Sequence, residues 1–91
     1  MKFPFKEKQL NSYLFLREFS ADVDEMDLIW HTDREDRIVH VIEGNKWKFQ
    51  FDEQLPFEML DDMDIIIPKG VIHRIIKGKG PLKIKVYKEP A

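Results

Sequence analysis

Alternation of apolar and polar residues is clearest in the middle of the chain. Residues 46–52 carry an aromatic side chain at every second position, namely Trp47, Phe49 and Phe51. Successive side chains of a strand point to opposite faces, so this pattern predicts a strand with one buried face. The preceding segment, Arg37–Glu43, alternates too and is rich in β-branched residues. Gly44 and Asn45 tolerate positive φ, so the two segments are predicted to form a hairpin.

Other short apolar segments, bounded by charged or turn-forming residues, predict the remaining strands. We expect these strands at residues 13–19, 28–33, 57–60, 65–67, 71–76 and 82–87. Residues 1–12 are expected to be a loose lead-in with one short helical turn at Lys6–Leu10. Residues 20–27 are acidic and are expected to form a loop or a frayed edge strand. Many short strands at intervals of about 8–12 residues predict an all-β sandwich or barrel.

One histidine falls on an apolar strand face. The apolar segments 65–67 and 71–76 flank a turn at Pro68-Lys69-Gly70, in which proline presets one φ angle and glycine accepts the reversal. Alternation puts His73 on the same face as its apolar neighbours two positions away. Either His73 is a core residue whose ring is hydrogen-bonded, or it is a ligand. From the residues alone we favour the core interpretation, because buried polar groups usually find ordinary partners.

Composition narrows the classes of function. The 91 residues, which we expect to form one domain over residues 1–91, carry 17 acidic and 15 basic side chains. This near balance gives no electrostatic case for nucleic acid, and no apolar segment approaches the ~18 residues of a membrane span. Cysteine is absent, which excludes disulfides and thiolate chemistry. We therefore expect a soluble, cytoplasmic, single-domain protein with neither nucleic acid nor a membrane as its partner.

Pro68, Gly70 and His73 have the spacing Pro-x-Gly-x-x-His. This spacing resembles the second motif of the cupins, small β-barrels of the jelly-roll type, which reads Gly-x5-Pro-x-Gly-x2-His-x3-Asn. Asp62 stands here at the first position of that motif and Lys77 at its last. The three matching residues are those that form the turn and place the histidine.

A second resemblance lies upstream. The first cupin motif reads Gly-x5-His-x-His-x3–4-Glu-x6-Gly; here His31 and Gly44 match it, while Asp33 replaces a histidine, Arg37 replaces the glutamate and Glu25 replaces the first glycine. The chain thus resembles a small single-domain cupin of the cupin-2 type with a degenerate first motif. The resemblance implies an all-β jelly-roll barrel.

The motif residues of cupins hold a divalent metal inside the barrel. The resemblance therefore implies that His31, Asp33 and His73 are metal ligands in this chain. His31 and Asp33 are two positions apart and share a face if their segment is a strand. Two imidazoles and one carboxylate suit Fe, Mn, Ni or Zn in the divalent state, with open positions for water or substrate.

Arg37 occupies the position of an expected carboxylate ligand, although a guanidinium is always positive and offers no lone pair. Three outcomes are open. Arg37 turns aside to pair with Glu35 or Glu43, which leaves three ligands. Alternatively, Glu35, which has the same strand parity as His31, replaces the missing carboxylate. In the third outcome no metal binds, and Arg37 forms an anion-binding group with His31 and His73.

Two functions are compatible with these residues. In the first, a metal in the barrel acts on a small polar metabolite, which Arg37 and Phe49 contact. In the second, the barrel is a metal-free, non-catalytic module that binds a small anion or sugar. The resemblance and the need to cover sheet edges both imply a homodimer. Metal content separates the two functions.

Overall fold

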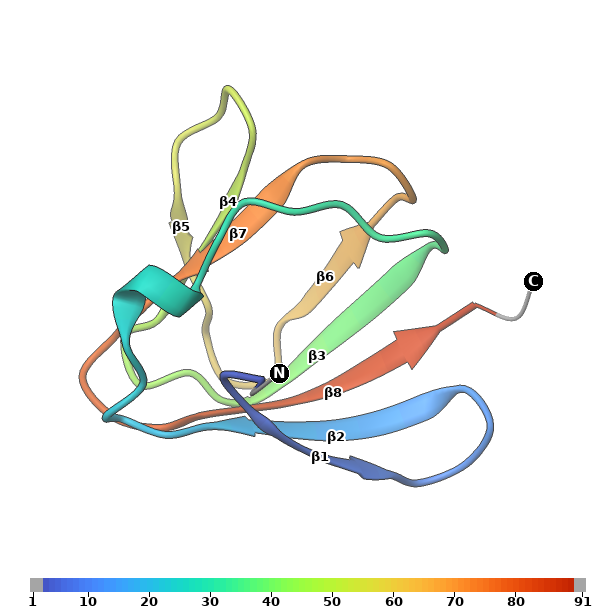
Figure 1. Cartoon of the computed structure of the whole chain (residues 1–91), viewed down its shortest axis with the longest axis horizontal. Helices are drawn as coiled ribbons and strands as arrows, with labels where there is room; N and C mark the ends of the chain where they lie inside the picture. Colours follow the sequence, from blue (N-terminus) through green and yellow to red (C-terminus); the bar gives the residue numbers. More distant parts are fainter. Residues whose placement is uncertain (1–2, 90–91) are drawn as a thin grey trace.

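The computed structural model describes residues 3–89, and nearly all of its regular structure is β-strand. The elements are β1 (Lys6–Gln9), β2 (Leu14–Phe19), the 3-10 helix η1 (Glu25–Asp27), β3 (Arg37–Glu43), β4 (Lys48–Phe51), β5 (Phe57–Glu58), β6 (Asp64–Ile67), β7 (His73–Ile76) and β8 (Leu82–Lys88). They form a five-stranded sheet, β1-β2-β8-β3-β6, and a three-stranded sheet, β5-β4-β7. Figure 1 shows the two sheets facing each other. The predicted all-β barrel architecture is confirmed.

Alternate strand positions build the core between the sheets. Trp47 and Phe49 are 0% and 2% exposed, and Phe51 is half-buried on the same face. The Trp47 Nε1–H donates to the carbonyl of Gly80 at 2.7 Å, so its one polar atom is satisfied inside the barrel. The aromatic face predicted from alternation is therefore the core side of this segment.

The hairpin predicted between Arg37–Glu43 and residues 46–52 is wrong. β3 pairs with β6 and β8, whereas β4 pairs with β5 and β7, so the turn after Gly44 carries the chain from one sheet to the other. Positive φ occurs at Asn45 and Lys46, at 47° and 69°. Gly44 is instead needed for a close approach, because a Cβ there would lie 1.7 Å from the Met59 carbonyl oxygen. The turn thus presses against the segment after β5.

The helical turn predicted at Lys6–Leu10 is wrong, and so is the extent of the loose lead-in over residues 1–12. Residues 6–9 form β1, which pairs antiparallel with β2. All four of its residues are exposed and show no apolar alternation, so the local sequence carries no strand signal. Its extended form comes from hydrogen bonding to the neighbouring strand, a tertiary effect that overrides propensity.

The strand predicted at residues 28–33 is also wrong. In this segment only His31 forms a bridge, with His73, and η1 precedes it. The rest runs as a loop across the open end of the barrel toward β3 (Figure 1). No helix within residues 3–89 is long and apolar enough to cross a membrane.

Candidate functional site

A pair of backbone hydrogen bonds brings the two histidines together. The amide of His31 donates to the carbonyl of His73, and the amide of His73 donates to the carbonyl of His31, each at 3.0 Å. The pairing places the two rings 4.3 Å apart, centroid to centroid, at an angle of 62°. Residues 42 positions apart in the sequence thus share one site at the start of β7.

Two hydrogen bonds fix the loop that carries the acidic residue. The amide of Gly70 donates to the carbonyl of Asp33 at 3.0 Å, and the amide of Lys69 donates to Oδ1 of Asp36 at 2.8 Å. Gly70 has a φ of 78°, a conformation that glycine adopts at little cost. The Pro-Lys-Gly turn therefore does more than reverse the chain, because it anchors the loop that presents Asp33.

His31, Asp33 and His73 converge in space. Each offers one ligand atom, and these atoms lie within 4.8 Å of one another. Nε2 of His73 is 3.3 Å from Oδ2 of Asp33, and Nε2 of His31 is 3.9 Å from Oδ1. Asp33 and His73 have side chains only 5% and 4% exposed, whereas that of His31 is 47% exposed. Solvent therefore reaches the cluster beside His31.

The outer nitrogen of each ring is bound to the backbone. Nδ1 of His31 donates to the carbonyl of Ile29 at 3.0 Å, and Nδ1 of His73 donates to the carbonyl of Val71 at 2.8 Å. A carbonyl only accepts, so Nδ1 carries the proton in both rings. In a neutral imidazole this leaves the Nε2 lone pair free, and both lone pairs belong to the converging atoms.

The carboxylate of Asp33 is incompletely satisfied. Its Oδ2 is buried and has no hydrogen-bond partner among the described residues, because the contact with His73 is within ion-pair distance but is not a hydrogen bond. Burial on its own raises the pKa of the Asp33 carboxyl, but the interaction with a His73 ring that carries a proton on Nε2, and then the charges of Arg37 and His31, outweigh burial. The pKa of Asp33 lies below its ordinary value, so the group is an anion at neutral pH.

Arg37 lies beside this carboxylate. Its Nη1 is 3.3 Å from Oδ1 of Asp33, and its Nη2 is 3.2 Å from Oε2 of Glu35. Nε donates to the same Glu35 oxygen at 3.3 Å. Arg37 therefore pairs with Glu35, which is the first of the three outcomes expected from the sequence, and it also contacts Asp33. Glu35 lies against the guanidinium and is not among the residues that converge with the two histidines.

Phe49 is buried next to the candidate site, whereas His40 lies on the outer surface. Phe49 lies beneath the site, where its ring stacks on that of His73 with centroids 5.5 Å apart and an angle of 13°. It is buried at 2% exposure and belongs to the core cluster. The His40 side chain, in contrast, is 40% exposed and its Nδ1 is 2.7 Å from Oδ1 of Asp64. His40 faces outward, as its strand parity predicts.

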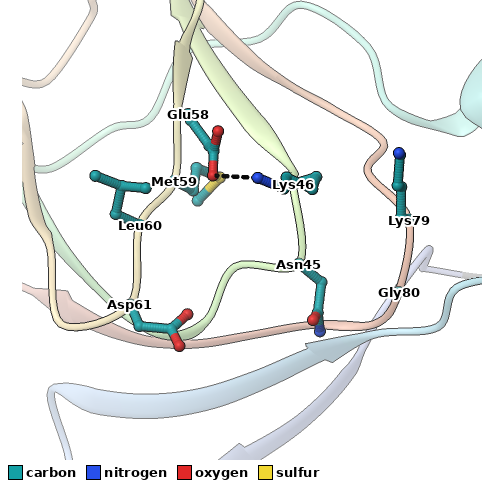
Figure 2. A pocket seen from close by; sticks show the side chains of 8 residues that line it. All are labelled: Asn45, Lys46, Glu58, Met59, Leu60, Asp61, Lys79 and Gly80. Atoms are coloured by element: carbon teal, nitrogen blue, oxygen red, sulfur yellow. Dashed lines mark ion pairs between the residues drawn. The ribbon is translucent and has the colours of Figure 1, made fainter.

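A cleft on the described surface lies away from this cluster. Its volume is about 500 Å³, and Figure 2 shows the side chains that line it. It is lined by Asn45, Lys46, Glu58, Met59, Leu60, Asp61, Lys79 and Gly80. In the register of β4 and β7, Lys48 pairs with Ile76 while Phe51 pairs with His73, so the cleft and the histidines lie at opposite ends of these strands. We place the candidate site by its chemistry, because three potential ligand atoms converge at the histidines and none of these residues lines the cleft.

The backbone partners of the His31 and His73 rings were not predicted from the sequence. Ile29 and Val71 each stand two residues before a histidine, and each offers its carbonyl to the Nδ1 of that ring. The same local geometry therefore occurs twice. A histidine in an extended segment can reach the carbonyl two residues earlier, but only the structure shows that both rings do so. This orientation decides which nitrogen is available.

The donor set fits a divalent cation. Two imidazole nitrogens and one carboxylate on one side of an ion form the two-histidine, one-carboxylate arrangement typical of non-haem Fe(II) sites with open positions. The buried, unpartnered Oδ2 of Asp33 and the oriented Nε2 atoms are what such an ion would contact. The guanidinium of Arg37 compensates part of the charge of Asp33 from the other side.

Comparison with known proteins supports the fold. No protein-family model matches the chain, and no curated protein matches it in sequence. Among solved structures, the chain is similar to a cupin-2 domain protein from Shewanella frigidimarina. The TM-score is 0.67 and the identity 22%, over 100% of this chain and 83% of that one.

Two further structures extend the comparison. An RmlC-like cupin with a double-stranded β-helix fold from Methanocaldococcus jannaschii has a TM-score of 0.70 and 14% identity, over 98% of this chain and 83% of that one. The Fe(II) protein HppE has a TM-score of 0.67 and 14% identity, and 84% of this chain matches 41% of HppE. The chain thus has the cupin fold, as the motifs implied, and spans less than half the length of HppE.

Proposed function

We propose that the chain binds one divalent transition metal through Nε2 of His31, Nε2 of His73 and the carboxylate of Asp33. The observation that carries this proposal is the meeting of three acceptors with a buried, unpartnered oxygen among them. In neutral rings whose Nδ1 atoms are bound to carbonyls, Nε2 of His73 faces Oδ2 of Asp33 lone pair to lone pair. A cation between them turns this repulsion into coordination.

Iron(II) is the metal that this donor set favours among Fe, Mn, Ni and Zn, because two imidazoles and a carboxylate leave open positions for small ligands. HppE, one of the similar structures, is an Fe(II) protein. When bound, the metal supplies Lewis-acid or redox chemistry at those positions. The exposed side of the cluster, beside His31, is where we expect a small polar metabolite to enter.

The chain's own residues then have separate roles. Arg37 orients Asp33 by contact with Oδ1 and leaves Oδ2 free toward His73. Glu35 holds the guanidinium on its other edge. Phe49 supports the ring of His73 from below, and in the proposed complex it limits the depth to which a substrate can enter.

A metal-free module for a small anion is the competing function. It requires the charge of Arg37 to be available to the anion. In the described structure two carboxylates already contact the guanidinium, at 3.3 and 3.2 Å. An anion would have to displace one of them, and this favours the metal site.

Metal reconstitution tests the proposal. Protein stripped with a chelator is loaded anaerobically with Fe(II), Mn(II), Ni(II) or Zn(II), and bound metal is measured by mass spectrometry after gel filtration. We expect one ion per chain in the wild type and a loss of affinity of more than about 100-fold in His73→Ala, since loss of outer partners alone costs about 10–100-fold. His40→Ala is the matched control and keeps the metal. A wild type that binds none of the four would exclude the site.

We also propose that the chain forms a homodimer, because contact between two copies would cover exposed edges of its sheets.

A further inference from the structure

One arginine on the outer face of the three-stranded sheet is held in place by uncharged side chains. Arg74 lies on β7 and is half-buried. Its Nε donates to Oε1 of Gln50 at 2.9 Å, and its guanidinium lies over the ring of Trp30, 4.5 Å from the centroid. No carboxylate within residues 3–89 is within ion-pair distance of Arg74, whereas Arg37 has two such partners.

Strand geometry brings these three side chains together. The mutual backbone hydrogen bonds of His31 and His73 form an antiparallel pair, so the residue before His31 lies opposite the residue after His73. His73 is buried on the barrel side, and its neighbour Arg74 therefore points outward, as does Trp30. Gln50 pairs with Arg74 in the register of β4 and β7. A row of outward side chains thus runs from β4 across β7 to the loop that carries Trp30 (Figure 1).

The orientation of the guanidinium is fixed from two sides. Nε2 of Gln50 donates to the carbonyl of Gln54 at 2.9 Å, so the amide that accepts from Arg74 is itself fixed. An arginine that is already ordered loses less side-chain entropy when it binds a ligand. Because Gln50 takes only Nε, the edge formed by Nη1 and Nη2 has no hydrogen-bond partner within residues 3–89. This edge matches the two oxygens of a carboxylate.

Two apolar side chains beside Arg74 are open to solvent. Trp30 and Ile72 are 40% and 41% exposed. The amide of Asp52 donates to the carbonyl of Ile72 at 2.9 Å, which continues the pairing of β4 and β7 by one residue. Ile72 and Arg74 are two positions apart and therefore share the outer face. Trp30, Ile72 and Arg74, which we call the arginine patch, combine one charge with two apolar surfaces.

We propose that the arginine patch binds an acidic peptide segment of a partner protein. A carboxylate of the segment accepts from Nη1 and Nη2 of Arg74, and an apolar side chain of the segment packs on Trp30 or Ile72. Tryptophan and arginine are the residue types that most often dominate binding at protein interfaces. A free anion would satisfy the guanidinium but leave both apolar side chains exposed, and this favours a peptide.

The spacing of the patch predicts the sequence that it recognises. Residues two apart on a strand lie about 6.6 Å from each other on one face, and this applies equally to β7 and to an extended peptide. Arg74 and Ile72 have this separation in the chain. The segment therefore carries Asp or Glu two positions from an apolar residue.

Asp52 is expected to limit the affinity of the patch. Its side chain is exposed, and it lies two residues from Gln50 and opposite Ile72, on the same outer face. Its negative charge is therefore close to the place where the carboxylate of the segment would bind. Like charges at such a range repel each other, so removal of the Asp52 charge should strengthen binding.

Selection from a display library of random linear peptides, with the full chain immobilised, tests the class of partner. We expect enriched sequences to carry Asp or Glu two positions from an apolar or aromatic residue. The affinity of a synthetic peptide of the enriched sequence, measured by calorimetry, should fall at least about tenfold in Arg74→Gln. Arg34→Gln is the matched control, because Arg34 is an exposed arginine outside the patch. A selection that enriches nothing, or enriches sequences without acidic residues, overturns the proposal, and so does an unchanged affinity of Arg74→Gln.

Two further measurements separate direct contact from a structural role of Arg74. The peptide with Gln or Asn in place of its acidic residue should bind the wild type about tenfold more weakly, with no further loss in Arg74→Gln. Asp52→Asn should bind the acidic peptide about threefold more tightly or better. Additive losses from the amide peptide and Arg74→Gln overturn the contact, as does weaker binding by Asp52→Asn. Circular dichroism checks the fold of each variant. None of the patch residues is a proposed metal ligand, so these results stand whether or not the metal site is disproved.

Discussion

Nε2 of His73 lies 3.3 Å from Oδ2 of Asp33, and that oxygen is buried without a hydrogen-bond partner. Nδ1 of the same ring donates to Val71, so the neutral ring presents a lone pair to the carboxylate. An arrangement of this kind costs stability unless a proton or a cation lies between the atoms. The contact between these two atoms is the reason why we expect a bound metal to stabilise the folded site relative to the metal-free protein.

Asp33→Asn should abolish tight metal binding. The amide keeps the shape of the side chain but removes the negative charge, and one of its two polar atoms becomes a donor that cannot ligate. We expect affinity for Fe(II) or Zn(II) to fall by about 100-fold or more, measured by competition with a chromophoric chelator. Asp36→Asn is the control on the same loop. Equal affinity of Asp33→Asn and the wild type would show that Asp33 is not a ligand.

Asp33 should also make the metal-free protein sensitive to acid. Burial raises the folded-state pKa, but the interaction with a His73 ring that carries a proton on Nε2, and then the charges of Arg37 and His31, outweigh burial, so the pKa of Asp33 lies below its ordinary value. The stability that it contributes is present above the unfolded-state pKa of about 3.9 and is lost as pH falls through the folded-state pKa. Urea unfolding with chelator at pH 7 and below should show a steeper acid loss for the wild type than for Asp33→Asn. Parallel pH profiles would contradict this assignment.

The core of the fold was predictable because its signal is local. Trp47, Phe49 and Phe51 alternate along one segment, and burial on one face follows from strand geometry alone. By contrast, β1 consists of Lys, Glu, Lys and Gln, and it is a strand only because β2 lies beside it. Residues 28–33 contain strand-forming residues but no partner for most of their length, so they remain a loop. Strand pairing in these segments depends on distant residues, which a single sequence does not reveal.

Gly44 and Gly70 both stand in predicted turns, but the structure needs glycine at the two positions for different reasons. A Cβ at Gly44 would lie 1.7 Å from the carbonyl oxygen of Met59, whereas a Cβ at Gly70 would meet nothing within 4 Å. Gly70→Ala incurs only the cost of a positive φ, about 1–2 kcal/mol. Gly44→Ala must move backbone, and we expect a loss of about 3 kcal/mol or more in urea unfolding. Equal losses in the two variants would contradict the close approach.

The identity of the candidate site residues was predictable from the sequence, whereas the contacts between their side chains were less predictable. The spacing of Pro68, Gly70 and His73 resembles a known motif and places one histidine, and His31 follows from the upstream motif. The partners of Arg37 depend on side-chain rotamers and on the loop at Asp33, neither of which the sequence specifies. The structure selects pairing with Glu35 and adds Asp33. Arg37, at the degenerate position of the first motif, thus carries a positive charge beside the carboxylate of Asp33.

Arg37→Gln therefore provides the sharpest test of how this chain departs from the cupin motif. The guanidinium lies 3.3 Å from the carboxylate that we assign to the metal and opposes a cation there. Removing it should tighten metal binding by about tenfold or more, because like charges a few ångströms apart repel by several kcal/mol even at an effective dielectric constant of about 20. The amide retains a donor for Asp33 and limits the loss of orientation. Arg34→Gln is the control, since Arg34 is exposed on the same loop. If Arg37→Gln instead weakens binding while Arg34→Gln does not, then the chief contribution of Arg37 is to hold Asp33 in place, and its charge is the smaller effect.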